Sequence, residues 1–296
     1  AILSGHDRIH HLPGEFSVVR CSTCGLMRTD PRPTPESMGF YYPDDYGPYA
    51  ATKISKMAGS RGRLSKWQRG IKRLIRFRTD ILPDIKPGSL LEIGCASGSF
   101  LHKMAEMGWE VKGIELSEKA AAHARNFGYD VFCGAIDHAS YPGNSFDLVA
   151  GWMVFEHLHD PVLSLKKLEK WVRPGGFLVI SVPNAKSLDF RIFKSRWYAL
   201  HLPNHLYHYT PESMNKVLIR GGWQIKKIFH QRTVSNLIAS VGYVLRDHEI
   251  LPRMADKFAT YPQNAAWLQY LLYPLAWGLG LFGQTGRMTI WAMKKQ

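Results

Sequence analysis

Two glutamates and the tight turn between them are the residues whose types and spacing most clearly indicate chemistry. Residues 90–98 read Leu-Leu-Glu-Ile-Gly-Cys-Ala-Ser-Gly, so an apolar run carrying Glu92 leads into a turn of small residues. Backbone amides in such a turn can approach a ligand closely. Glu115 ends the next apolar run, where a carboxylate can accept hydrogen bonds from the two hydroxyls of a ribose.

This turn does not fit a dinucleotide. The dinucleotide fingerprint requires glycine at 94, 96 and 99, and the chain has Gly94, Ala96 and Ser99. Glu92 would repel a pyrophosphate and attract a cationic amine. Gly94 alone would indicate only a strand-to-helix connection, but with both acids the pattern predicts a nucleoside with a positive, non-phosphorylated tail. S-adenosylmethionine matches that description.

The elements that must position these residues alternate between apolar runs and helical patterns, which is typical of a parallel, doubly wound α/β sheet. The predicted strands are Ser89–Ile93, Trp109–Glu115, Asp130–Cys133, Phe146–Trp152 and Phe177–Val182, with helices from about Gly98, from Ser117 and ending in Arg173–Gly176. Thr210-Pro-Glu-Ser predicts a capped helix. Strands near Gln224–Gln231 and at Arg287–Ala292 complete the set.

Four zones divide the chain. We expect a small Cys/His/Tyr-rich module of irregular structure over residues 1–50 and a basic amphipathic helical segment over 51–88. The core is expected over 89–232 and 284–296, with an apolar helical insertion over 233–283 before the last strand.

Four motifs of the core, in order and correctly spaced, resemble a known family. They are residues 90–98, Ile114-Glu-Leu-Ser117, residues 146–157 (Phe-Asp-Leu-Val-Ala-Gly-Trp-Met-Val-Phe-Glu-His) and Val172-Arg-Pro-Gly-Gly-Phe-Leu. Together they resemble the class I S-adenosylmethionine-dependent methyltransferases, and most closely the branch with the ubiquinone-biosynthesis O-methyltransferases. The resemblance implies a Rossmann-like, seven-stranded methyltransferase sheet with S-adenosylmethionine as cofactor.

The same resemblance implies a cofactor site. The residues it places around the cofactor are Glu92, Gly94, Ala96 and Gly98 at the methionine part, Glu115 at the ribose, Ala135 and Ile136 at the adenine, and Trp152 and Met153 beneath it, with Leu116 as a further cofactor-binding residue. The family usually has glycine where Ala96 stands.

Histidines are the candidate catalytic residues. Methyl transfer from a sulfonium is an in-line displacement whose leaving thioether needs no acid, so the protein mainly holds the acceptor and excludes water. A hydroxyl acceptor benefits from a general base, and histidine suits neutral pH. We predict His205 first and His157 second as base or acceptor ligand; the alternative is that both are scaffold histidines that hold loops.

Cys21 and Cys24, in Cys-Ser-Thr-Cys-Gly, form half of a zinc-ribbon pattern. A tetrahedral zinc site needs two further ligands, which His6, His10 and His11 could supply. The alternative is a pair of reduced thiols in a proline-rich loop.

The charge distribution suggests an anionic partner. Lysine and arginine exceed aspartate and glutamate by 14, and ten basic residues without an acid occupy Lys53–Arg78. Residues 265–282 are uncharged and rich in Trp and Tyr, the residue types found at the headgroup level of a bilayer. Because the last strand must rejoin the sheet, we expect this segment to lie at a membrane surface rather than to span it; a dimer contact, a buried hairpin and an active-site lid are the alternatives.

Composition excludes global disorder, since 45% of residues are hydrophobic and 21% are charged. Four cysteines are too few for a disulfide scaffold, and the start of the chain lacks the pattern of a secretory signal, so we expect a cytoplasmic protein, peripheral on the inner face of the membrane.

We predict a methyltransferase that acts, at oxygen, on a lipid-like or lipid-linked acceptor. The alternatives are a methyltransferase on a soluble sugar or secondary metabolite and a non-catalytic cofactor- or nucleic-acid-binding module. A nucleic acid is not expected, because the basic stretch lacks an RNA- or DNA-binding fold signature. The oligomeric state stays open.

Overall fold

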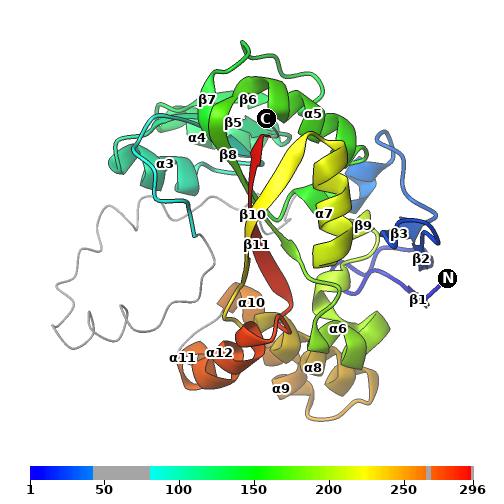
Figure 1. Cartoon of the computed structure of the whole chain (residues 1–296). Coiled ribbons are helices and arrows are strands. Elements are labelled where there is room, and N and C mark those ends of the chain that lie inside the picture. The colour runs from blue at the N-terminus through cyan, green and yellow to red at the C-terminus, as the bar shows by residue number, and fades with distance from the viewer. Residues whose placement is uncertain (43–80, 265–267, 295–296) are drawn as a thin grey trace, which may run out of the picture.

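The computed structural model describes residues 1–42, 81–264 and 268–294. The strands in chain order are β1 (Leu3–Gly5), β2 (Phe16–Arg20), β3 (Met27–Asp30), β4 (Ser89–Ile93), β5 (Glu110–Glu115), β6 (Asp130–Cys133), β7 (Phe146–Trp152), β8 (Val172–Pro183), β9 (Tyr207–His208), β10 (Trp223–His230) and β11 (Arg287–Lys294). A seven-stranded sheet has the order β10-β11-β8-β7-β4-β5-β6. This confirms the predicted α/β class and its seven-stranded sheet (Figure 1).

The central strands β7, β4, β5 and β6 run parallel, so their carboxyl ends meet at one edge. β8 also runs parallel to β7, whereas β11 is antiparallel to both β8 and β10. The last strand therefore rejoins the sheet between β8 and β10, as predicted.

Adjacent residues of β4 show why both faces of the sheet are covered. Leu90 packs with side chains of α3 (Ser99–Glu106) and α4 (Glu118–Asn126). Leu91 points the opposite way and packs with α5 (Pro161–Trp171) and α7 (Pro211–Arg220). Because side chains alternate along a strand, a strand apolar at successive positions is buried on both faces. Figure 1 shows the two helical layers on opposite sides of the sheet.

Local sequence fixes where the helices begin. The Thr210 side chain accepts from the Ser213 backbone amide and Ser213 bonds back to Thr210, so α7 begins with the expected cap and with Pro211 at its first position. α5 ends at Trp171 rather than at Arg173–Gly176 as predicted. Residues 172–176 instead begin β8, where Val172 pairs with Phe146 of β7 and its side chain is buried in the core.

The expectation of irregular structure in the N-terminal segment is wrong, because its described residues include three strands. β1, β2 and β3 form an antiparallel sheet with β9, and β9 comes from the segment just before α7. The apolar side chains of β2 and β3 pack with residues between Ala185 and Leu202. These strands have three to five residues, too few for a clear alternation in sequence.

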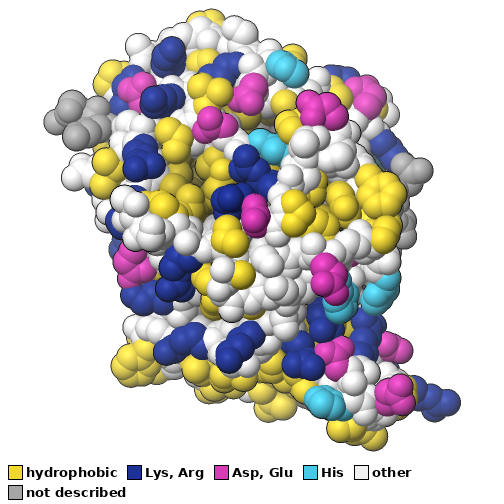
Figure 2. Space-filling view, turned by 90° about the vertical axis from the view of Figure 1, so that its right-hand side faces the viewer, with side chains coloured by type: hydrophobic (Ala, Val, Ile, Leu, Met, Phe, Trp, Pro, Cys, Tyr) yellow, Lys and Arg dark blue, Asp and Glu magenta, His cyan; other side chains and the backbone are white. Residues whose placement is uncertain are grey.

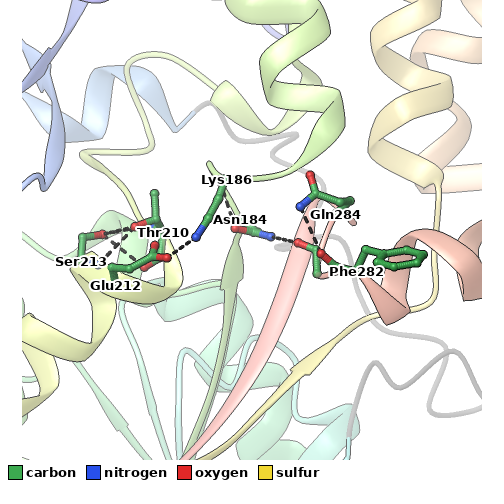
Figure 3. Close-up of polar contacts among 8 residues, drawn as sticks. Asn184, Lys186, Thr210, Glu212, Ser213, Phe282 and Gln284 are labelled. Atoms are coloured by element: carbon green, nitrogen blue, oxygen red, sulfur yellow. Dashed lines mark hydrogen bonds and ion pairs between the residues drawn. The ribbon is translucent and has the colours of Figure 1, made fainter.

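The segment between β10 and β11 is helical: α8 (Ser235–Asp247), α9 (Pro252–Ala259), α10 (Tyr261–Asn264), α11 (Leu268–Leu271) and α12 (Tyr273–Leu281). It forms the lower end of the molecule in Figure 1. Asn184, after β8, donates from its side chain to the carbonyls of Gly283 and Thr285 and so ties the end of this insertion to the sheet (Figure 3).

Asn184 also belongs to a chain of polar contacts that reaches α7. Its side-chain oxygen accepts from the Lys186 amide, and the Lys186 ammonium pairs with Glu212 in the first turn of α7.

The other short helices of the described residues are η1 (Met38–Tyr41), η3 (Phe155–His157), α6 (Leu188–Phe193), η4 (Lys194–Arg196) and η5 (Tyr198–Leu200).

Within residues 1–42, 81–264 and 268–294, no helix combines the length and apolar character needed to cross a membrane. The basic stretch Lys53–Arg78 and the first three residues of the 265–282 segment lie outside the described residues.

Candidate active site

The bend after β4 has left-handed backbone at three positions. The φ angles are +67° at Gly94, +47° at Ala96 and +86° at Gly98. A β-carbon at Gly94 would lie only 2.5 Å from Cγ2 of Val154, so this position is closed to larger residues. Glycine adopts the left-handed conformation of Ala96 without strain. Alanine adopts it at a cost of roughly 1 kcal/mol. The alanine is therefore compatible with the tight turn.

Glu115 joins this bend to the end of β5. Its carboxylate accepts from the Ala96 amide and from the Ser117 amide, each at 2.8 Å and on different oxygens. Burial raises the pKa of Glu115, and the hydrogen bonds from these amides oppose that shift. A carboxylate has about four acceptor positions, so Glu115 retains capacity for hydroxyl donors.

Glu92 lies deeper than Glu115, with 3% of its surface exposed. Its Oε2 has no hydrogen-bond partner among the described residues. Burial raises its pKa well above the usual value, the negative charge of Glu115 raises it further, and the Leu101 amide partly opposes both. A buried carboxylate oxygen without a partner, beside a second carboxylate, provides a position for a cation. The ammonium and sulfonium of S-adenosylmethionine fit this requirement.

The other residues expected at the cofactor follow the neighbouring strands. Leu116, directly after β5, exposes 63% of its surface. Trp152 ends β7, packs edge-on against Phe100 and has a buried indole nitrogen without a partner among the described residues. Met153 has φ +58° and donates its amide to Ser181.

The predicted adenine residues follow β6. Ala135 is half-buried, whereas the Ile136 side chain belongs to the core of the sheet. The four strands lie side by side in the order β7-β4-β5-β6 and run parallel. The predicted cofactor residues, which stand at or after the carboxyl ends of these strands, therefore gather at one edge of the sheet.

A histidine cluster joins His157, shortly after β7, to His201 and His205 from the segment between η5 and β9. The His157 ring lies 4.7 Å from that of His205, and His201 lies 4.8 Å from His205, measured between ring centroids. Burial lowers the pKa of His157 to about 4 and that of His201 to about 3, and it lowers the pKa of His205 well below its usual range. These rings are therefore neutral at physiological pH and keep a nitrogen lone pair, and the lowered pKa makes each of them a weaker base than an exposed histidine.

Glu156 is the residue of this cluster that the sequence analysis missed. Its side chain is fully buried, and Oε1 lies 4.0 Å from His205 Nε2. Burial raises its pKa to about 8, and its own backbone amide and the positive charge of Arg287 partly offset this. Glu156 directly follows the apolar run 148–155, and an acid so close to a buried strand was a signal in the sequence, because glutamate is rarely buried without a partner.

The cysteine pair does not gather further metal ligands in the described part of the chain. Cys21 is exposed and Cys24 half-buried at the turn between β2 and β3. The group that does meet the distance requirement for three ligands, among the residues described, is Glu156, His157 and His205. His10 lies instead near His201, with ring centroids 6.4 Å apart, so the proposed supply of zinc ligands by the N-terminal histidines has no support here.

Comparison with known proteins gives the family. A sequence profile described as a methyltransferase domain matches residues 64–228, which is more than half of the chain. The chain therefore belongs to the methyltransferase-domain family, which confirms the family-level resemblance read from its motifs.

Relatives include ubiquinone biosynthesis O-methyltransferases of Sinorhizobium fredii and Rhizobium etli. Each is 32% identical over 148 residues, a match that covers 46% of this chain and 60% of the relative. The chain thus spans less than two thirds of the length of these relatives.

Solved structures share the fold. The (4+2)-cyclase SpnF has a TM-score of 0.50 and 20% identity, with 89% of this chain and 97% of that one covered. A methyltransferase in complex with the Haloferax volcanii Trm112 methyltransferase activator has a TM-score of 0.50 and 14% identity, with 72% and 85% covered. At these identities the likeness concerns the fold alone.

Proposed function

We propose that this protein transfers a methyl group from S-adenosylmethionine to an oxygen atom of a lipid-like or lipid-linked acceptor at a membrane surface. The observation that carries the cofactor assignment is the buried, unpartnered oxygen of Glu92 beside a narrow bend held by Glu115. Glu92, with Gly94, Ala96 and Gly98, would hold the methionine part. Glu115 and Leu116 would hold the ribose.

The remaining cofactor residues have assigned places in this proposal. Ala135 and Ile136 would lie beside the adenine, where Ile136 can contribute its backbone because its side chain belongs to the core. Trp152 and Met153 would lie beneath the cofactor, and the edge-on packing of Phe100 holds the Trp152 ring in place.

The reaction needs alignment more than acid catalysis. The acceptor oxygen attacks the methyl carbon, the carbon–sulfur bond breaks, and its electron pair leaves on the neutral thioether of S-adenosylhomocysteine. The hydroxyl proton must leave as the new carbon–oxygen bond forms. His205, and next His157, are the proposed acceptors of that proton, because a neutral imidazole has a nitrogen lone pair that can take it.

The helical insertion supports a lipid-like acceptor. Apolar side chains that are exposed on α11, α12 and the residue that follows are Tyr270, Leu271, Leu275, Trp277, Leu281 and Phe282. Phe282 exposes 80% of its surface. In Figure 2 apolar side chains line the lower edge of the molecule, with lysines and arginines in a row directly above them. Such an arrangement favours an anionic bilayer, whose interior accepts the apolar groups while its headgroups attract the cations.

Two kinds of acceptor match this chemistry: a quinone precursor and a polyprenyl-linked glycan. The curated relatives with a role in ubiquinone biosynthesis are O-methyltransferases by name, which supports oxygen as the methylated atom. The test is to incubate the full chain and isotopically labelled S-adenosylmethionine with membrane lipid extract and, separately, with soluble metabolites. Mass spectrometry then identifies the labelled product.

Label in a lipid is the expected result. Label only in soluble sugars or secondary metabolites would support the alternative acceptor class, and no label in either with no calorimetric binding of S-adenosylmethionine would support a non-catalytic protein.

Flotation with vesicles that contain anionic lipid tests the surface separately. The chain should float, and a Leu281→Ser, Phe282→Ser double variant should float less. An Ile219→Ser variant is the matched control, because Ile219 is also an exposed apolar residue but lies on α7. Equal flotation of all three proteins would count against the membrane surface.

A further inference from the structure

Arg287 is a half-buried cation without a counterion. It is the first residue of β11, and its Nε is buried with no hydrogen-bond partner in the described part of the chain. Among those residues its terminal nitrogens make no ion pair either, whereas the two terminal nitrogens of Arg8 donate to Asp247 at 2.8 and 3.0 Å. A guanidinium withdrawn from water normally has such a partner, so its lack at Arg287 indicates a position for an anion.

The acids near Arg287 do not neutralise it. Burial lowers the pKa of Arg287, and the charges of Tyr198, Glu156 and Asp189 oppose that shift from a distance. Burial raises the pKa of Glu156 to about 8, so this carboxyl group is largely protonated at neutral pH, whereas a guanidinium stays charged. Asp189 Oδ2 accepts from the Trp197 indole nitrogen at 3.0 Å instead.

The register of the sheet places Arg287 on the face that carries Trp152. Trp152 pairs with Ser181 of β8, Ser181 pairs with Thr289, and Arg287 pairs with Pro183 at the carboxyl end of β8. Paired residues, and residues two apart in a strand, point to the same face. Two strand spacings of about 4.8 Å and one two-residue step of about 6.8 Å put the Arg287 backbone roughly 12 Å from that of Trp152. An acceptor beside the proposed cofactor position at Trp152 would therefore lie within reach of a long arginine side chain.

The backbone that carries Arg287 is held by the sheet. The Gln231 amide donates to the Arg287 carbonyl at 3.1 Å. The Gln231 side chain donates to Ser181 Oγ at 2.6 Å and to Thr289 Oγ1 at 3.1 Å, and all three of these side chains are buried. A binding group on a rigid strand is positioned more accurately than one on a loop.

We propose that Arg287 binds an oxyanion, either a carboxylate or a phosphate, that the methyl acceptor carries. The planar guanidinium can donate two parallel hydrogen bonds to such a group. β11 directly follows the helical insertion with its exposed apolar side chains, so an anion at Arg287 fits the headgroup end of a lipid-like acceptor. Binding of the anion stands on the geometry alone, whereas its attachment to the acceptor rests on the proposed function.

Two pairs of probes test the assignment. Calorimetry measures the binding of benzoate against neutral benzamide, and of geranyl phosphate against neutral geraniol, to the full chain with and without S-adenosylhomocysteine. We expect one anion to bind at least about tenfold more tightly than its neutral counterpart, and which anion does so identifies a carboxylate or a phosphate as the natural group. Arg287→Gln should weaken the binding of that anion by about tenfold to a hundredfold and leave the neutral probe unaffected.

Two further variants control for charge and for folding. Lys294→Gln removes a cation from the other end of the same strand, where Lys294 pairs with Glu169, and should keep the affinity for the anion. Arg287→Lys keeps the charge but loses the planar fork, so it should bind the anion with intermediate affinity. Arg287→Gln should melt no lower than the parent chain, because it removes a charge that has no partner.

A lower melting temperature of Arg287→Gln with unchanged affinity for the anion would show a structural role and overturn the proposal. Equal binding of the anionic and neutral probes would overturn it as well. Anion binding that depends on Arg287, without methyl transfer to any acceptor, would contradict the proposed function and leave the anion site standing. Methyl transfer whose kcat and KM do not change in Arg287→Gln would do the reverse.

Discussion

Glu92 and Glu156 stand near the carboxyl ends of the neighbouring strands β4 and β7, and both are buried with a carboxylate oxygen that lacks a partner among the described residues. Their surroundings differ. Glu92 faces a second carboxylate and a bend of backbone amides, whereas Glu156 faces neutral imidazole rings.

The difference shows how one residue type acquires two environments. Two neighbouring carboxylates repel each other, and an organic cation bound beside them relieves that repulsion. A single buried carboxyl group beside neutral rings has no such repulsion to relieve. Changes at the bend should therefore act on cofactor binding without disturbing the histidine cluster, and the following predictions test that separation.

Gly94→Ala should have the largest effect. The new β-carbon would collide with Val154 and would also occupy a left-handed conformation. We expect the free energy of unfolding to fall by about 2–4 kcal/mol, the sum of strain and overpacking. Urea denaturation measures it.

Gly128→Ala is the matched control for that change. Gly128 has φ +88° but nothing within 4 Å of the added atom, so it carries the strain without the collision. A loss of about 1–2 kcal/mol is expected there. Equal losses in the two variants would show that Val154 does not restrict the bend.

Glu115→Gln should act on the cofactor next most strongly. It replaces a charged acceptor at the proposed ribose position and disturbs the bonds to Ala96 and Ser117. We expect S-adenosylmethionine affinity to fall by about 1.5–3 kcal/mol, roughly tenfold to a hundredfold, as measured by calorimetry.

Glu110→Gln is the matched control, because Glu110 begins the same strand and is exposed. Its cofactor affinity should equal that of the parent chain. An equal loss of affinity in both variants would contradict the assignment of Glu115 to the ribose.

The pH dependence of stability should identify Glu92. Burial and the negative charge of Glu115 raise the folded pKa of Glu92 above the unfolded value of 4.5, and the Leu101 amide partly opposes this. Folding therefore favours the protonated form, and the stability this contributes is present below pH 4.5 and is lost as the pH rises through the folded pKa.

Glu92→Gln should remove that loss, which is at most about 1.4 kcal/mol per pH unit. Denaturation curves of cofactor-free protein at several pH values measure it, with Glu106→Gln as an exposed control on α3. Cys95 and Glu115 are the other titrating groups that face Glu92. Identical pH profiles for Glu92→Gln and the parent chain would contradict the assignment.

Ala96→Gly should have the smallest effect. The change removes the backbone strain of an alanine in the left-handed conformation, but it raises the conformational entropy of the unfolded chain. Because these effects oppose each other, the free energy of unfolding should change by about 1 kcal/mol or less. The bend should keep its affinity for S-adenosylmethionine. A large loss of affinity would show that the Ala96 methyl group contacts the cofactor.

The sequence by itself determined the sheet and the bend. The β4 run, the small-residue turn and Glu115 lie within 27 residues, 89–115, and parallel strands bring their carboxyl ends to one edge whatever the rest of the chain does. Local rules also fixed the start of α7, because its cap is made by residues three positions apart. Such short-range patterns survive in the sequence since few other residues influence them.

Only the tertiary structure decided what surrounds Glu156. His205 is 49 positions away along the chain, and it reaches the cluster because the 198–206 segment leads into β9, which pairs with β3 of the N-terminal strands. The burial of Glu156 and the carbonyls that orient His157 and His205 come from that packing. No spacing in the sequence encodes these contacts, because they depend on how segments far apart in the chain pack together. The environment of the buried Glu156 is the combined result of all these segments.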